Sequence, residues 1–445
     1  MGNSHEKSSE YKGPFGDIEY DQLARKYEAL TKSRKSDDIH ANFKTAFHLY
    51  VPDTMPQHLR TPLEDFGVFI YRLCALQNES NASDTIKHIS LPAFVRAVTR
   101  CTRLSPQSIL TSIYSLFDPQ GCNAIERSQM QLLFLSVLLM MQENEAVPST
   151  AYIEVTEALT TALMSDNDTV QSEQFVQWTT SVLPLLYSVI STWMSSKALE
   201  TFATRSYSSP KLTHRSEILS LPQFHLLSCV TTHLQGDIDR IYTSMEDGLS
   251  YNRLCFHLLG YSGPTLIVIQ DVEGAIFGAF CDTEWKESNR FYGGNGCFLF
   301  RFRPDFHIYR AATLHQSGNH MYLNTKGFSL PRGLGVGGDL TEFRMFLSED
   351  FDENCYTTTR CLSYEPGPLS SRKRFSIALL EIWGCGGEKS MLKQKAHRQD
   401  TADMIAHARK VDKAQFVGND FDKEMFLGRT FGHGTNQARV VEDQS

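Results

Sequence analysis

Two glycine-rich motifs in this 445-residue chain have the spacing of known catalytic or cofactor-binding loops. Residues 333–338 (Gly-Leu-Gly-Val-Gly-Gly) satisfy the G-x-G-x-x-G pattern of dinucleotide enzymes, in which the loop follows a strand and opens a helix. Here the strand-like segment 341–347 follows, so we interpret the glycines as a close-packing turn. Residues 260–264 (Gly-Tyr-Ser-Gly-Pro) place a serine between glycines, but Pro264 stands where a nucleophile elbow has its last glycine. Neither motif predicts catalysis.

Thiol and acid/base chemistry gives weaker signals. The ten cysteines form no C-x-x-C pair, which is typical of reduced, mostly buried thiols of a cytosolic protein. A reactive thiol needs exposure and a neighbouring cation, with Cys281 and Cys297 as the candidates. Glu381 stands at the end of an expected strand, where we favour a backbone or Arg partner over an acid/base role. We therefore predict no catalytic residue, no cofactor and no metal.

Charge and hydropathy exclude two other classes of protein. The chain has 43 Lys and Arg against 51 Asp and Glu, a formal net charge of -8 that argues against nucleic-acid binding. The most apolar stretch, residues 132–141, is about ten residues long, whereas a membrane span needs about 20. The N-terminus lacks the apolar core of a secretory signal.

The elements that must position these residues fall into two regions. Helical periodicity begins near Asp17 and dominates residues 41–199, and the Ser/Thr/Arg-rich segment 201–216 is typical of a linker. Strand-like runs follow with no intervening helices of crossover length, which predicts antiparallel pairing. These runs are 265–269, 275–280, 297–302, 307–310, 341–347 and 375–383.

The helical region keeps the apolar skeleton of EF-hands but not their ligands. Ile89, Ile125 and Val170 each occupy loop position 8, and the 36-residue spacing of the first two suggests that they form a pair. Around Ile125, Asp118 is the one carboxylate, and Gln129 replaces the bidentate Glu at position 12. We expect calcium-free scaffolding. A calcium-responsive protein using Asp118 and the acidic residues 166 and 168 is the open alternative.

An ordered series of motifs in residues 219–387 resembles the TLDc family. The motifs are Ile241–Ser250, Gly260–Thr265, Phe277–Phe280, Trp285-Lys286, Phe291–Gly294, Cys297–Phe300, Leu334–Gly338 and Glu381–Gly384. The resemblance implies a two-sheet antiparallel β-sandwich flanked by helices, so the whole chain is expected to be α+β. Phe277 and Phe280 are expected to pack in the sandwich core, and each tryptophan indole needs a hydrogen-bond partner. The residues assigned to the structural motif are Gly260, Gly263, Pro264, Gly278, Trp285, Gly335, Gly338, Glu381 and Trp383.

By its layout the chain resembles the lysosomal, MTOR-associated (EAK-type) branch of this family. That resemblance implies binding to the peripheral sector of the vacuolar-type proton ATPase, a link to MTOR signalling, and a cytoplasmic protein held peripherally on lysosomal or other endomembranes. It also implies myristoylation of Gly2, although Glu6 stands where the usual signal has Ser or Thr. A single myristoyl chain anchors only marginally, so protein docking is expected to supply the second signal.

The C-terminal tail carries the partner-binding hypothesis. Residues 389–411 are expected to form a charged helix, and four phenylalanines then recur every five residues among glycines: Phe416, Phe421, Phe426 and Phe431. Exposed rings of this kind are stabilised only when they bury against another surface. We predict that they bind a partner, and the alternative is that they fold back on the TLDc surface.

The expected organisation is an N-terminal segment that carries the acylation signal (1–40), an EF-hand-like helical region (41–200), a linker (201–216), a TLDc domain (217–387) and a C-terminal helix with a Gly/Phe tail (388–445). We predict a non-enzymatic adaptor that binds the proton pump. The alternative from another class is an oxidative-stress protection protein with a reactive thiol.

Overall fold

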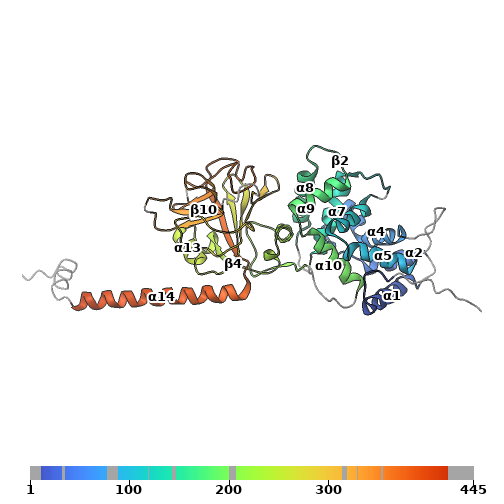
Figure 1. Cartoon of the computed structure of the whole chain (residues 1–445), viewed down its shortest axis with the longest axis horizontal. Helices are drawn as coiled ribbons and strands as arrows, with labels where there is room; N and C mark the ends of the chain where they lie inside the picture. The colour runs from blue at the N-terminus through green and yellow to red at the C-terminus, as the bar shows by residue number, and fades with distance from the viewer. Residues whose placement is uncertain are drawn as a thin grey trace, which may run out of the picture.

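The computed structural model describes residues 12–32, 36–77, 89–118, 120–142, 147–199, 207–312, 318–327, 329–351 and 354–418. A helical region is followed by a domain of two stacked β-sheets and then by a long C-terminal helix, α14 (Gly387–Gly418), which extends away from the body (Figure 1). The predicted α+β class is confirmed.

The helical region begins at Asp17, as the periodicity predicted. Ser90 caps α5 and Ser105 caps α6, and each helix has proline in its first turn, a combination that fixes a helix start. Helix α7 is buried on nearly all sides and forms the centre of the region. The helices are α1 (Asp17–Thr31), α2 (Ser36–Ala46), α3 (Gln57–Glu64), α4 (Phe66–Ala75), α5 (Leu91–Thr102), α6 (Pro106–Phe117), α7 (Arg127–Met140), α8 (Ser149–Met164), α9 (Ser172–Val182) and α10 (Leu186–Ala198).

One EF-hand-like pair is built from α6–α7 and α8–α9. Between these helices lie two short strands, β1 (Ile125–Glu126) and β2 (Thr169–Val170), which pair antiparallel with Ile125 opposite Val170. The predicted pairing of Ile89 with Ile125 is therefore wrong. Ile89 lies before α5, where its carbonyl accepts a hydrogen bond from the Tyr27 hydroxyl at 2.8 Å.

The β-domain contains a seven-stranded and a four-stranded sheet, in the orders β3-β4-β13-β5-β6-β7-β8 and β12-β11-β10-β9. All pairs are antiparallel except β3 with β4. Edge strand β3 lies in the segment predicted as linker. The remaining elements are β3 (Pro210–Leu212), α11 (Leu221–Ser228), the 3-10 helix η1 (Thr232–Leu234), β4 (Gly236–Thr243), α12 (Ser244–Asp247), α13 (Tyr251–Leu258), β5 (Thr265–Asp271), β6 (Ile276–Cys281), β7 (Phe298–Arg303), β8 (His307–Arg310), β9 (Met321–Asn324), β10 (Gly333–Gly338), β11 (Phe343–Ser348), β12 (Tyr356–Thr357) and β13 (Ile377–Gly384).

The larger sheet is buried on both faces. In β5, Ile267 and Ile269 face the core between the sheets, whereas Leu266 belongs to the cluster that continues into the helical region. Phe277 packs between the sheets as predicted, but Phe280 stacks on Phe298 on the opposite face. The expectation for Phe280 was wrong because residues three apart on a strand point to opposite sides.

Polar contacts join the helical region to the β-domain. The Leu185 N–H donates to the Cys229 carbonyl at 2.9 Å, next to α11. The Arg310 guanidinium at the end of β8 donates to the carbonyls of Ser181 (2.8 Å) and Val182 (3.2 Å) beside α9. Since one apolar cluster also runs through both parts, the described structure is not two independently buried cores.

The glycine run 333–338 is strand β10 rather than the predicted turn. A Cβ at Gly335 would lie 2.3 Å from the Phe343 ring on β11, and one at Gly333 would lie 2.6 Å from the Phe346 ring. Aromatic rings therefore cover the bare glycine backbone, as they do at other strand glycines. The close packing was predicted correctly, but the strand that carries it was not.

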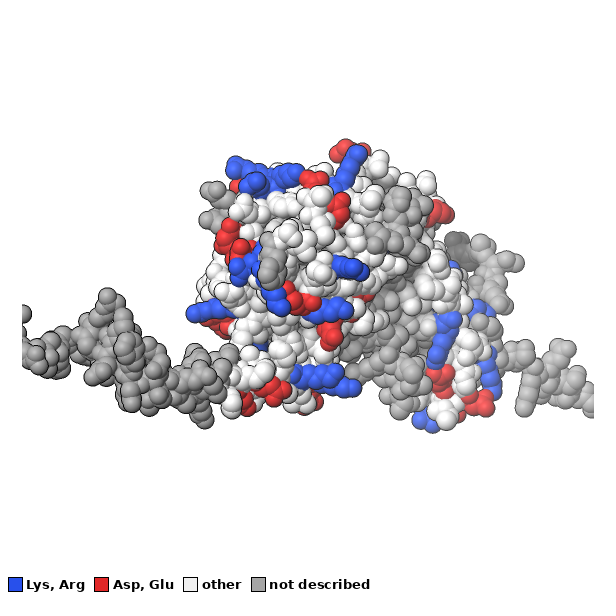
Figure 2. All heavy atoms as spheres, turned by 60° about the vertical axis from the view of Figure 1, so that its left-hand side comes forward, with Lys and Arg blue, Asp and Glu red and all other residues white. Residues whose placement is uncertain are grey.

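On the face shown in Figure 2, Lys and Arg side chains alternate with Asp and Glu, and no single-sign area dominates. Among the described helices, none combines the length and the hydropathy that a bilayer span needs.

Candidate interaction site around helix α14

The base of α14 is fixed by close backbone packing. A Cβ at Gly263 would lie 2.9 Å from the Gly386 Cα, and one at Gly260, where φ is +85°, would meet the His397 ring at 2.5 Å. The Ser390 hydroxyl donates to the Ser262 carbonyl at 3.2 Å. The glycines of the 260–264 motif therefore admit the first turns of α14, in addition to leading the chain into β5.

Two further side chains of α14 hold it against α13. The Gln394 amide donates to the carbonyl of His257, and the Arg398 guanidinium reaches the same carbonyl at 3.4 Å and the His257 Nδ1 at 3.1 Å. The His257 Nε2 lies 3.3 Å from an Asp247 carboxylate oxygen. Burial lowers the pKa of Arg398, with Asp247 acting in the opposite direction. Ser390, Gln394 and Arg398 recur every four residues, so one face of the helix makes all these contacts.

Beyond Arg398 the helix leaves the body (Figure 1). The side chains described between residues 399 and 407 are exposed, apart from the half-buried Thr401. Three apolar side chains of α14 and the neighbouring α13 are exposed. Their exposed fractions are 57% for Leu392, 65% for Met404 and 51% for Phe256. Together with Met245 and Leu249 on and after α12, they form what we name the α12–α14 apolar set.

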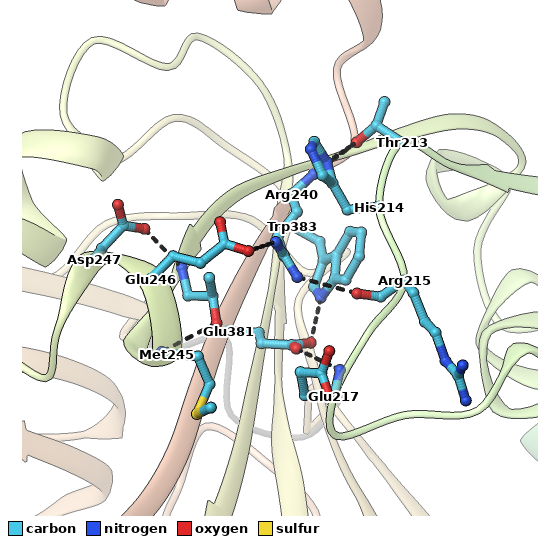
Figure 3. A network of polar contacts seen from close by, with 11 residues as sticks. Thr213, His214, Arg215, Glu217, Arg240, Met245, Glu246, Asp247, Glu381 and Trp383 are labelled. Atoms are coloured by element: carbon cyan, nitrogen blue, oxygen red, sulfur yellow. Dashed lines mark hydrogen bonds and ion pairs between the residues drawn. The ribbon is translucent and has the colours of Figure 1, made fainter.

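The segment before α11 is tied to β13, an interior strand of the larger sheet, by Glu381 (Figure 3). This carboxylate is 1% exposed and accepts hydrogen bonds from the Ser216 hydroxyl (2.6 Å), the Glu217 backbone N–H (2.8 Å) and the Trp383 indole N–H (3.0 Å). Trp383 in turn packs edge-on against Phe224 of α11. Three donors converge on one buried charge, a structural arrangement in which the carboxylate is neither free nor facing a substrate-sized space.

The same network continues to α12 through Arg240 on β4 (Figure 3). Its guanidinium donates to the Arg215 carbonyl at 3.0 Å and pairs with Glu246 at 2.6 Å. Its backbone N–H donates to the Thr213 hydroxyl at 3.2 Å. The contacts of Arg240 therefore attach two segments to the β4–β13 strand pair. One is the chain that enters the domain, and the other is helix α12, which carries part of the α12–α14 apolar set.

The other predicted motif residues serve packing in the same domain. A Cβ at Gly278 would lie 1.9 Å from the Ile267 carbonyl oxygen, so β5 and β6 approach too closely for any side chain there. The buried Trp285 indole donates to the Thr265 hydroxyl at 2.8 Å, which supplies the partner that the sequence required. At Gly338, φ is +92°, which ends β10.

The residues predicted to bind a partner or to carry the acyl chain are described only in part. Phe416 belongs to the backbone of α14, whereas Phe421, Phe426 and Phe431 lie outside the described residues, as does Gly2.

The calcium-loop carboxylate is occupied by its own loop. The two oxygens of Asp118 accept from the backbone N–H groups of Cys122 (3.1 Å) and Asn123 (2.8 Å). Asn123 in turn bridges the two loops, accepting from the Ser172 N–H at 3.0 Å and donating to Glu173 at 3.2 Å. Within the described residues, no group of three or more His, Cys, Asp or Glu side chains is arranged to hold a metal ion.

The two candidate thiols are buried. All ten cysteines are free, and Cys281 and Cys297 are 0% and 1% exposed. Burial, with Cys297 and Asp282 as further causes, raises the pKa of the Cys281 thiol well above its ordinary value. The Cys297 thiol donates to the Asp282 carboxylate at 3.2 Å. For Cys281, burial and the neighbouring Asp282 carboxylate disfavour the thiolate, so the environment of this thiol is the reverse of the one that activates a nucleophilic cysteine.

Two of the cavities among the described residues border the helical region, outside the sandwich core. One of about 340 Å³ is lined by residues of α7 and α10, including Trp193 and Lys197. Another, of about 500 Å³, opens between α8 and the β6–β7 side of the domain, near Glu154 and Arg303. These two side chains form an exposed ion pair at 2.6 Å.

Sequence reasoning missed His257, Gln394 and Arg398, which anchor α14. The four-residue recurrence of Ser390, Gln394 and Arg398 was visible in the sequence. Nothing in the sequence indicated that His257 would contact these side chains, because the contacts depend on the His257 carbonyl and ring facing α14 in the folded protein.

Comparison with known proteins finds a family model that matches the β-domain. The family model described as "TLDc domain" matches residues 212–386. "MTOR-associated protein MEAK7" of Xenopus laevis is 32% identical over 178 residues, which are 40% of this chain and 38% of that protein. Its Gallus gallus counterpart is 28% identical over 209 residues, 44% of each chain.

A second group of relatives carries another name. "Oxidation resistance protein 1" of Xenopus tropicalis is 31% identical over 183 residues, 39% of this chain and 19% of that protein. The chain therefore aligns with less than half of the length of each of these relatives.

Proposed function

We propose that this chain, which carries a TLDc domain in residues 212–386, is a non-enzymatic adaptor linked to MTOR signalling that docks on the peripheral, ATP-hydrolysing sector of the vacuolar-type proton ATPase. The link to MTOR comes from relatives that are named for that association. We further propose a cytoplasmic protein held peripherally on lysosomal or other endomembranes, with myristoylation at Gly2.

The observation that carries this proposal is the geometry of α14. At 32 residues the helix is about 48 Å long, and its described side-chain contacts with the domain come from its first three turns. A solvent-exposed helix gains little stability of its own, because helical stability in proteins comes mainly from packing. A helix that is anchored at its base and carries exposed Leu392 and Met404 is suited to burying these groups against another protein.

Charge gives the partner a chemical character. Helix α14 contains seven Lys or Arg and four Asp or Glu residues, so its excess is positive although the chain as a whole is negative. A partner surface with acidic residues around an apolar centre fits this helix, because charge complementarity steers association. Binding that differs between two states of the pump would shift the pump between them.

Affinity capture tests the proposal. Full-length protein and a version truncated after Val411 are captured from solubilised lysosomal membranes, and partners are identified by mass spectrometry. The proposal predicts recovery of peripheral pump subunits with the full-length protein. Truncation leaves Leu392 and Met404 in place but removes the four phenylalanines of the tail that are predicted to bind a partner, so the recovery should fall at least about ten-fold, which corresponds to about 1.4 kcal/mol of binding free energy. Intact pump preparations from which neither protein recovers a subunit would overturn it.

The oxidative-stress alternative is favoured by one finding, the relatives named for oxidation resistance. The buried environment of Cys281 argues against a thiol enzyme. Rates of thiol alkylation in the folded protein distinguish the two: a reactive-thiol enzyme needs fast labelling at Cys281 or Cys297, whereas the adaptor requires none.

A further inference from the structure

Cys281 and Cys297 lie opposite each other on neighbouring strands. The β6–β7 register pairs Phe280 with Phe298, so one step outward brings Cys281 opposite Cys297. Both sulfurs belong to the core between the two sheets, whereas Phe280 and Phe298 belong to the cluster on the other face. The two thiols therefore share one side of the sheet.

The pattern of backbone hydrogen bonds indicates how far apart the two cysteines lie. The Cys297 N–H donates to the Gly294 carbonyl at 3.3 Å and not across to Cys281. The cysteines thus occupy a non-hydrogen-bonded position, where opposite Cα atoms are about 4.5 Å apart. Disulfides span Cα separations from about 4.4 to 6.8 Å, so the pair is at the short end of the permitted range. The influence of Cys297 on the pKa of Cys281 is a second sign that the sulfurs are neighbours.

We propose that Cys281 and Cys297 form a redox modification site at which a hydroperoxide-class oxidant closes a cross-strand disulfide. In the first step one sulfur attacks a peroxide oxygen, the O–O bond breaks, and a sulfenic acid and water form. In the second step the other thiol attacks the sulfenic sulfur, the S–S bond forms, and the hydroxyl group leaves with the thiol proton as water. Two thiols and one hydrogen peroxide give one disulfide and two waters, so the sulfurs lose two electrons and the peroxide gains them.

The surroundings of the pair assign the first attack to Cys297. It follows directly on the exposed Asn295 and Gly296, whereas Cys281 lies within strand β6. Its S–H points to an oxygen of Asp282, which is placed to receive the proton. Cys281 is deeper, and its thiol then resolves the sulfenic acid without needing access to solvent.

Oxidation changes the set of hydrogen bonds that the Asp282 carboxylate accepts. In the thiol form this carboxylate accepts from the Cys297 S–H and from the N–H groups of Gly294 (3.0 Å) and Gly296 (3.1 Å). A disulfide removes the S–H donor and leaves the loop on two bonds. Thiols reopen a disulfide by exchange, so the proposed modification is reversible. The proposal is independent of whether the chain binds the proton pump.

Peptide mapping of the full-length protein tests this proposal. The purified chain is treated with hydrogen peroxide, denatured in an alkylating agent and digested with trypsin without reduction. The expected product links residues 254–286 to 291–301, with a mass about 2 Da below the sum of the two peptides. Dithiothreitol applied before alkylation should separate them.

Matched variants identify the bond. Peptide 254–286 also contains Cys255, so Cys255→Ala is the control and should leave the linked peptide in place. Cys281→Ala and Cys297→Ala should each abolish it. The proposal is overturned if Cys297 of the wild-type protein proceeds to sulfinic acid with no cross-link, if it links to another cysteine, or if both thiols stay alkylatable once the exposed Cys122 is oxidised.

Discussion

Replacing Glu381 with glutamine tests whether the buried carboxylate is a structural group. The side chain accepts from Ser216, Glu217 and Trp383, and all three donors converge on its two oxygens. Glutamine has one acceptor oxygen, so at least one N–H or O–H then faces an NH₂ group. A hydrogen bond to a charged group contributes about 1.5–3 kcal/mol, and an unsatisfied buried donor costs a similar amount.

Relief of the desolvation cost of the buried charge offsets part of this loss. We expect a net decrease of about 2–3 kcal/mol in the free energy of unfolding, or about 5–10 °C in Tm for a domain of this size. The assay is chemical and thermal denaturation of the full-length protein, followed by tryptophan fluorescence. Glu217→Gln is the matched control, because Glu217 is exposed and enters the network through its backbone N–H alone. Equal stability of the two variants would refute the structural role.

Three further predictions concern stability. Burial lowers the pKa of His225 to about 4, against about 6.5 when unfolded, so the unfolded chain binds the proton first and stability falls as pH drops from about 6.5 towards 4. His225→Phe should remove up to about 3 kcal/mol of this pH-dependent change in the free energy of unfolding, measured by denaturation curves across that pH range. His214→Gln, at an exposed position, should leave the pH dependence unchanged. Gly278→Ala should cost about 3 kcal/mol or more in chemical denaturation because its Cβ would meet the Ile267 carbonyl, while Gly16→Ala, with open space, should cost little. Because the oxygens of Asp118 are occupied by loop N–H groups, millimolar calcium should leave the Tm of the wild-type protein unchanged, and a calcium-dependent rise would contradict that assignment.

The domain fold was largely predictable from sequence because its signals are local. Apolar runs such as 265–269 and 297–302 are strands, and the turn that joins β5 to β6 contains Gly274, with φ of +88°. Helix α14 begins where polar helical pattern begins. These features depend on short-range propensity and on turn glycines, which a single sequence displays directly.

The predictions of other features failed because these features depend on contacts with residues that are distant in sequence. The pairing of Ile125 with Val170 rather than with Ile89 is decided by which helix pairs are adjacent in space. The glycines of β10 resemble a turn until the rings of β11 are placed over them. Phe280 faces the helical region because the larger sheet is covered on both sides, and a strand buried on both faces loses the alternation that would have indicated its orientation.

The candidate site was predicted only in outline. Glu381 was expected to meet a backbone or Arg partner, and it accepts from the backbone of Glu217, with Ser216 and Trp383 in addition. The contacts of Arg398 with His257 depend on the orientation of α14, which no local pattern encodes.

Direct binding to the isolated peripheral sector of the proton pump tests the central claim most sharply. Full-length protein, a Leu392→Ala/Met404→Ala double variant and a matched variant with polar exposed positions of α14 replaced (Gln399→Ala/Asp403→Ala) are compared by interferometry at physiological salt. The adaptor account predicts saturable binding that the apolar double variant weakens at least about ten-fold, about 1.4 kcal/mol, while the polar control changes it little. Absence of binding by the full-length protein, or equal affinity of all three proteins, would contradict it.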